Sequence, residues 1–193
     1  MSTYTGTQTE VLFANGFAYP AAASNSTSAQ SLITGASGKY QQPVFYGGFF
    51  QQGRTGQVAA AEFAVSLTGE SSATTAIFTA GLATAANSSG STLVAAQPFT
   101  CTNFSSGTVH GRVLISNWGS GYGTSSVATN LQSTISLIAN TASAAGVAAA
   151  GGPTQLATVD FSVNQWFYLT VTFSTSTSSN SATLEQVVLF GLN

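Results

Sequence analysis

The sequence predicts an all-β protein, an antiparallel sandwich of two sheets, and three observations support this prediction. Apolar and hydroxyl side chains alternate along several short segments, most cleanly from Leu169 to Phe173, which places them on opposite faces of a strand. Clusters of Gly, Asn and Ser separate these segments and supply turn conformations. No segment combines an N-cap with sustained helical periodicity and good helix formers, so we expect little helix.

Eight segments carry the strand pattern and suggest which kind of sandwich forms. In chain order they cover approximately 61–68, 75–83, 92–99, 109–116, 133–138, 155–161, 169–173 and 184–192. Eight strands joined by long polar loops favour the jelly roll, which is the common eight-strand sandwich. An immunoglobulin-type sandwich is the alternative, but the Cys-Trp-Cys core of its disulfide-bearing members is absent.

The strand pattern divides the chain at about residue 42. Residues 43–193 are expected to form the sandwich domain, and residues 1–42 an N-terminal arm that contacts a neighbouring subunit or a larger shell. The arm has two apolar islands in a Ser-, Thr-, Ala- and Gln-rich segment, and their larger residues are Val11, Leu12, Phe13, Phe17 and Tyr19. A second interpretation remains open, in which this segment is an N-terminal strand of the same sandwich followed by a long loop.

Charged residues make up only 4% of the chain, against roughly 25% in an ordinary soluble domain. The three basic residues are Lys39, Arg54 and Arg112, and the net charge is -2. They form no basic stripe that could neutralise phosphates or anionic lipid, which argues against nucleic acid and membrane surfaces as partners.

The scarcity of charge also bears on assembly. Edge strands are normally guarded by Lys, Pro or an inward charge, and here such guards are few. We therefore expect neighbouring subunits to cover the edges in a homo-oligomer, with a trimer favoured. The apolar run near the C-terminus needs cover on both of its faces, and it adds Val187, Val188, Leu189 and Phe190 to the expected interface.

The N-terminal segment and the cysteine content bear on the cellular compartment. The segment from Met1 to Thr5 has no positive region followed by an apolar core, so we expect no signal peptide. Cys101 is the only cysteine and cannot form a disulfide within the chain. A free cysteine usually behaves as a small buried hydrophobe, and the reactivity of Cys101 stays open.

The residues offer little for catalysis, metal binding or a cofactor. His110 and Asp160 are the only residues of their types, and no Gly-x-Ser-x-Gly elbow accompanies them as a serine hydrolase would require. Glu62 and Glu185 lie singly in predicted strands, so a solvated or arginine-paired carboxylate is favoured over a glycosidase pair. One His and one Cys cannot build a zinc site. We expect no enzyme, no metal and no cofactor.

One loop has the composition of a sugar-binding platform. Trp118 and Tyr122 stand in a glycine-rich stretch, where exposed rings could stack on a glycan. The alternative is a tryptophan that anchors its own loop.

The C-terminal part carries a resemblance to known proteins. Strand-like segments at 157–163, 168–173 and 183–189, separated by a Ser/Asn loop, and an aromatic pair before Gly-Arg at 49–54 supply it. In these features the chain resembles the jelly-roll virion structural proteins of tailed bacteriophages, which include head-decoration, fibre-like and tail-associated proteins. The resemblance implies a multimeric virion component, often trimeric, with no enzymatic residues.

The sequence therefore leads to one expected function and one alternative. We expect a trimeric head-decoration (minor capsid) protein, located in the virion, that binds the major capsid protein and stabilises the assembled shell. The alternative is a tail-fibre or tail-tip module that recognises host cell-surface glycan through Trp118 and Tyr122. The long N-terminal arm and the Ala/Gly-rich loop at 142–152 depart from the resemblance.

Overall fold

The structure of this chain is a computed structural model, and all statements below concern the residues that it describes. These are 9–15, 27–33, 42–47, 58–69, 75–86, 91–92, 99–102, 106–117, 128–129, 131–141, 147–148, 154–155, 159–160, 163–176 and 179–192. The regular elements in these ranges are all β-strands. The predicted all-β class is confirmed.

The strands form two principal antiparallel sheets. The six-stranded sheet has the order β1 (Thr9–Asn15), β15 (Ser181–Leu192), β4 (Val58–Thr68), β8 (Ser106–Asn117), β10 (Leu131–Thr141) and β12 (Thr154–Gln155). The seven-stranded sheet has the order β11 (Val147–Ala148), β7 (Phe99–Thr102), β5 (Thr75–Ala83), β14 (Gln165–Phe173) and β2 (Gln30–Ser31), while β3 (Val44–Phe45) also pairs with β14 and β6 (Ser91–Thr92) with β5. A separate small sheet joins β13 (Val159–Asp160) to β9 (Ala128–Thr129).

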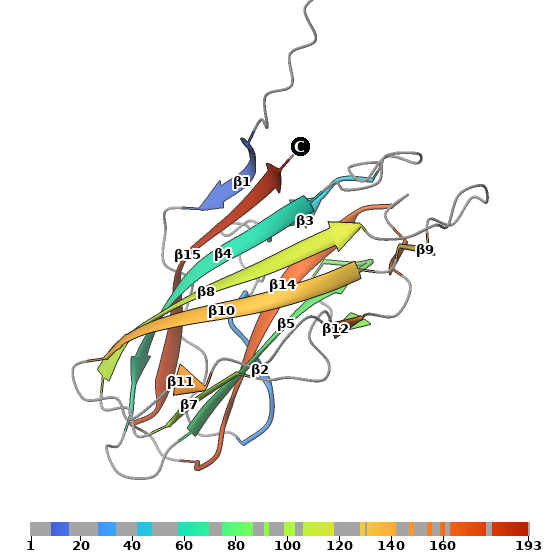
Figure 1. Ribbon diagram of the computed structural model, residues 1–193. Coiled ribbons are helices and arrows are strands. Elements are labelled where there is room, and N and C mark those ends of the chain that lie inside the picture. Colours follow the sequence, from blue (N-terminus) through green and yellow to red (C-terminus); the bar gives the residue numbers. More distant parts are fainter. Residues whose placement is uncertain are drawn as a thin grey trace, which may run out of the picture.

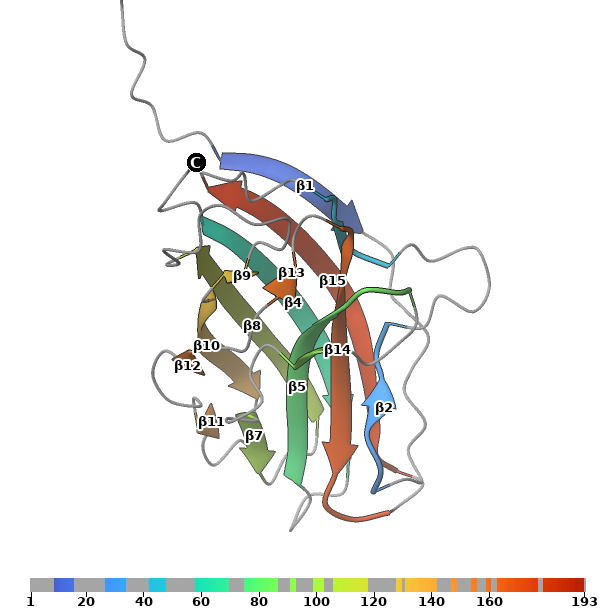
Figure 2. The same cartoon turned by 90° about the vertical axis from the view of Figure 1, so that its right-hand side faces the viewer.

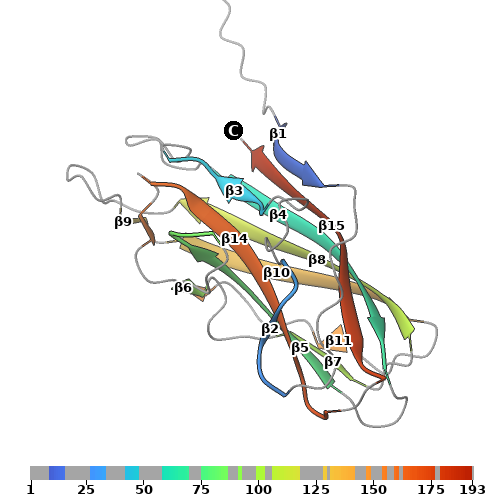
Figure 3. The same ribbon diagram turned by 180° about the vertical axis from the view of Figure 1, so that it is seen from behind.

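The two principal sheets lie face to face, which confirms the predicted two-sheet arrangement. In Figure 1 the long strands β15, β4, β8 and β10 lie in front of β14 and β5. Figure 2 shows the two layers from the side, and Figure 3 brings β14, β5 and β2 to the front. The C-terminus lies beside β1, at one edge of the six-stranded sheet.

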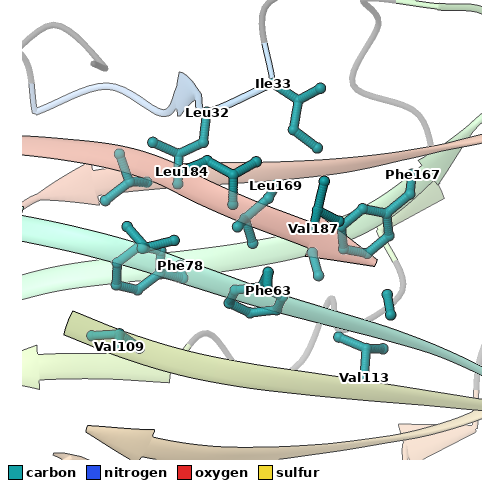
Figure 4. Close-up of a cluster of buried hydrophobic side chains, with 14 of the residues drawn as sticks. Leu32, Ile33, Phe63, Phe78, Val109, Val113, Phe167, Leu169, Leu184 and Val187 are labelled. Atoms are coloured by element: carbon teal, nitrogen blue, oxygen red, sulfur yellow. The ribbon is translucent and has the colours of Figure 1, made fainter. Parts of the chain in front are cut away.

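The core fills the space between the layers because each long strand turns every second side chain inward. Phe63 and Val65 on β4 and Phe167 and Leu169 on β14 all have exposed fractions of 3% or less. Figure 4 shows side chains from both sheets meeting between the ribbons, with Phe78 of β5 among them. This inward set leaves the alternate residues of β4, β8 and β15 on the outer face of the six-stranded sheet.

Most predicted strands coincide with observed ones, and the exceptions have physical reasons. The segment 75–83 matches β5, and the predictions at 61–68, 109–116, 133–138, 169–173 and 184–192 fall inside longer strands. The two ends of the single strand predicted at 92–99 are strand residues, but they belong to the separate strands β6 and β7, and residues 93–98 lie outside the described residues. The one predicted at 155–161 touches both β12 and β13, which lie in different sheets. Short polar stretches with alternating residues fit either one long strand or two short ones.

The N-terminal segment supplies strands to both principal sheets. β1 pairs with β15 at the edge of the six-stranded sheet, and β2 pairs with β14. Leu32 is fully buried in the core, and its N–H donates a hydrogen bond to the carbonyl oxygen of Leu169 at 2.8 Å. These contacts favour the second interpretation of this segment, as strands of the sandwich. The domain boundary at residue 42 stays a prediction.

Candidate functional site

The outer face of β15, β4 and β8 brings together polar side chains that are far apart in the sequence. Alternation on β4 turns Glu62 and Ala64 away from the core. The register places Glu62 between Val188 of β15 and Arg112 of β8. Directly opposite residues of antiparallel strands share a face, so all three side chains lie together.

The next row of the same face is built in the same way. Ala64 lies between Gln186 of β15 and His110 of β8. Because alanine is short and its neighbours are long, the central strand forms the floor of a groove, and Ala64 is 9% exposed there. The groove has a volume of about 490 Å³ and is lined by Glu62, Phe63, Ala64, His110, Gly111, Arg112, Gln186, Val188 and Phe190.

An ion pair crosses the groove between β4 and β8. Arg112 Nε lies 3.3 Å from Glu62 Oε1, and the two side chains are 43% and 45% exposed. The Nε atom itself is buried and makes no well-aligned hydrogen bond with any described residue. A half-exposed pair of this kind contributes at most about 1 kcal/mol to stability. The sequence had favoured a solvated or arginine-paired Glu62, and the arginine is its partner.

Glu185 reaches the same sheet through a bulge in β15. The register with β4 shifts between Leu184 and Gln186, which leaves Glu185 as the extra residue. Ser66 Oγ donates a hydrogen bond of 2.7 Å to Glu185 Oε1. This length is typical of a hydroxyl bonded to a charged carboxylate. Glu62 and Glu185 therefore each have a partner on a neighbouring strand.

The residues expected at an interface differ in their exposure. Val11 is 57% exposed and lies opposite Phe190 on β15, whereas Leu12 and Phe13 pack partly buried against the core. Val188 and Phe190 face outward and line the groove. Phe17 and Tyr19 lie outside the described residues.

Two members of that expected set need correction. Val187 and Leu189 are fully buried in the core of the sandwich, so their side chains are not available to another subunit. The apolar run of β15 does have cover on one face, but the opposite sheet of the same chain provides it. Only the outward residues of the run remain candidates for contact with a partner.

The residues singled out for chemistry are only partly described. His110 is exposed on β8, and Asp160 lies in β13 of the separate small sheet, where its side chain is not described. The backbone of Cys101 lies in β7, paired with Ala76 and Val147. Trp118 and Tyr122 lie outside the described residues. Within the described ranges, no group of three His, Cys, Asp or Glu residues is placed to hold a metal ion.

The groove was not predicted from the sequence, although part of its signal was present. His110 and Arg112 are two residues apart in a predicted strand, and so had to share a face. The sequence did not reveal that β4 pairs with β8 in the register that brings Glu62 and Ala64 between them and β15. This register depends on pairing between residues that are far apart in the sequence.

Comparison with known proteins adds no family to this description. No family model matches the chain, and no curated protein or solved structure matches it. The described part of the chain contains no helix with the length and apolar character of a membrane span.

Proposed function

We propose that this chain is a virion structural protein of a tailed bacteriophage, a head-decoration protein that assembles as a trimer on the capsid shell. The outer edge of β1, which no described strand covers, carries the proposal. This strand ends the six-stranded sheet, and its sequence Thr-Glu-Val-Leu-Phe-Ala-Asn contains no Lys or Pro. Val11 stands 57% exposed on it. With Glu10 as its only charged residue, this edge is suited to association with another chain.

One feature of β1 works against simple edge pairing. Its register shifts between Val11 and Phe13, and a bulge is one way in which natural edges are shielded. The bulge shortens the regular edge but leaves Val11 exposed opposite Phe190. We therefore place the subunit contact at the exposed side chain of Val11 rather than along a continuous strand ladder.

We further propose that the sandwich is a jelly roll, and the order of strand pairing supports this. Eight strands, β1, β2, β4, β5, β7, β8, β14 and β15, can be taken in chain order. The first pairs with the last, the second with the seventh, the third with the sixth and the fourth with the fifth. Such nested pairs form one long antiparallel ribbon, and rolling it up produces two sheets with two Greek keys.

A decoration protein of this design acts by mass action. If it binds the assembled lattice of the major capsid protein and not the free subunits, its binding free energy favours the lattice. Shape and apolar contact would carry the binding, because the chain has few charges with which to recognise a partner.

The subunit contact can be tested by the mass of the assembly in solution. Light scattering of the intact chain is expected to give a trimer, and Val11→Lys is expected to give a monomer with unchanged circular dichroism. Thr68→Lys is the matched control, because Thr68 is exposed at the far end of β4 in the same sheet. A monomeric wild-type chain, or a trimer that tolerates Val11→Lys, contradicts the proposed contact.

Position on the particle is tested separately. Quantitative mass spectrometry of purified virions is expected to give hundreds of copies for each particle, and particles lacking the protein are expected to lose DNA sooner on heating or in chelator. A few to a few dozen copies indicate the second candidate function, a tail-fibre or tail-tip module that binds glycan. The groove over Ala64 favours that candidate, because it presents several polar groups on one face.

A further inference from the structure

The groove over Ala64 concentrates polar chemistry in a chain that has very little of it. The whole sequence contains three basic residues, five acidic residues and one histidine. One of each, Arg112, Glu62 and His110, lines this groove. A face that needed only solubility could use Ser and Thr, as the rest of the chain does.

Most of the hydrogen-bonding capacity in the groove is unused within the described part of the chain. The only contact of the Arg112 guanidinium there is the one from Nε to Glu62, which leaves its terminal N–H groups without a described partner. His110 and Gln186 are exposed, and neither side chain forms a hydrogen bond with a described residue. Together these side chains offer guanidinium donors, a carboxylate acceptor, and an imidazole and an amide that can do both.

The opposite wall of the groove is apolar. Val188 and Phe190 of β15 line it, and both are partly exposed. An aromatic ring offers a flat surface to C–H groups. The groove therefore pairs a hydrogen-bonding wall on β8 with an apolar wall on β15, across the short side chain of Ala64.

The charges in the groove select against ionic ligands. The carboxylate of Glu62 offsets the guanidinium of Arg112, so a phosphate or another strong anion finds no net positive charge. A ligand with several hydroxyl groups along one edge and C–H groups on its face satisfies both walls. The volume of about 490 Å³ lies within the usual range of small-ligand sites.

We propose that this groove binds a short neutral saccharide, with Arg112, His110 and Gln186 bonded to its hydroxyls and Phe190 against its C–H face. This inference goes beyond the proposed function and does not rest on it, because the groove lining does not include Val11, where the subunit contact is proposed. It also differs from the Trp118 and Tyr122 loop in every residue involved.

The test uses the intact chain and saturation-transfer difference NMR with free sugars. The neutral probes are maltose, cellobiose, lactose, mannobiose, diacetylchitobiose and rhamnose, and glucuronate is the anionic probe. Irradiation of protein methyl groups is expected to transfer saturation to the C–H protons of at least one neutral sugar, because Val188 and Ala64 supply methyls inside the groove. Absence of transfer to every neutral sugar, or stronger transfer to glucuronate than to any of them, overturns the proposal.

Two variants place any observed binding in the groove. His110→Ala and Gln186→Ala change exposed side chains that have no described structural partner, and each is expected to weaken sugar binding by about tenfold. Thr183→Ala, which changes another outward position of β15 beyond the groove lining, is expected to bind like the wild type. Equal binding by all three variants shows that the sugar sits elsewhere and overturns the assignment.

A third variant tests the balance of charge. Glu62→Gln keeps the size of the side chain but leaves Arg112 unopposed, so glucuronate is expected to bind this variant more tightly than it binds the wild type. No gain for glucuronate contradicts the role given to the ion pair. Because these measurements use the isolated chain, they can fail while the trimer and its place on the virion stand, and the reverse also holds.

Discussion

The ring of Phe63 on β4 lies over Gly111, its partner across the strand pair on β8. A Cβ atom added at Gly111 would overlap the end of that ring. Phe63 is 3% exposed and belongs to the core, so its ring occupies the space that a side chain at position 111 would fill. The glycine thus sets how closely a large ring can approach the sheet beneath the groove.

Gly111→Ala is therefore expected to lower the free energy of unfolding by roughly 1–3 kcal/mol, the usual cost of overpacking a core. Urea denaturation of the isolated chain measures it. The double variant with Phe63→Leu is expected to recover part of the loss, because the smaller side chain makes room for the methyl group. Equal stability of Gly111→Ala and wild type contradicts this packing.

A second pairing of the same kind lies on the other sheet and provides a comparison. The ring of Tyr168 on β14 covers Gly81 on β5, and a Cβ there would overlap it. Tyr168 alternates with the core residues Phe167 and Leu169, yet it is only 5% exposed, so its ring is enclosed as that of Phe63 is. Gly81→Ala is therefore expected to lower the free energy of unfolding about as much as Gly111→Ala does. The same urea series measures both variants, and wild-type stability of Gly81→Ala contradicts the explanation.

Local patterns predicted the long strands because each buries one face. In β14 the alternation of Phe167, Leu169, Val171 and Phe173 with polar or aromatic neighbours is visible in the sequence, and all four are fully buried. In β1 the bulge at Leu12 breaks that alternation, so Val11, Leu12 and Phe13 form an apolar run with no period. A strand of this kind becomes recognisable only once its partner β15 is known.

The candidate site depends even more on partners that sequence patterns do not specify. Glu62 was expected on a polar face, and that was sufficient to suggest an arginine neighbour. Nothing local indicates that Gln186 of β15 and His110 of β8 flank Ala64 across two strand pairs. The site could not be predicted because the register of the strand pairs is not visible in the sequence. A shift of one residue in a strand would turn its side chains from this face to the core.

Leu32 tests whether the N-terminal segment belongs to the sandwich. Its side chain is fully buried in the core, and Leu32→Ala is expected to lower the free energy of unfolding by about 2–5 kcal/mol. Ser28→Ala is the control, because Ser28 is exposed in the same segment. Thermal or urea unfolding measures both. If Leu32→Ala unfolds like the control, the N-terminal segment is an independent arm and Leu32 is not part of the core.

The Glu62–Arg112 pair is expected to contribute little to folding. Its side chains are 43% and 45% exposed, so a double-mutant cycle with Glu62→Gln and Arg112→Met should give a coupling below about 1 kcal/mol. Repeating the cycle in high salt should remove most of this coupling, because screening acts on exposed charges. A larger coupling that survives salt indicates a buried pair and contradicts the half-exposed geometry.

The assembly as a whole is expected to resist salt. The chain has three basic and five acidic residues, so few ion pairs are available to hold subunits together. The contact proposed at Val11 is apolar, and its strength does not depend on charge. Light scattering in low and high sodium chloride is expected to give the same mass, and dissociation in high salt contradicts an apolar contact.

Replacing Trp118 and Tyr122 together with Ala distinguishes the loop that the sequence suggested from the shell role proposed for the chain. Rings stacked on a glycan would contribute on the order of 1 kcal/mol each, so a receptor platform at this loop predicts reduced adsorption to host cells. We expect unchanged adsorption, because sugar sites also need polar groups, and the sequence has no charged residue between Arg112 and Asp160. Particles carrying the double variant should retain DNA on heating as wild-type particles do, whereas particles lacking the protein should not. Impaired adsorption by the double variant, together with normal heat resistance of particles lacking the protein, would contradict the shell role and support the tail-fibre function.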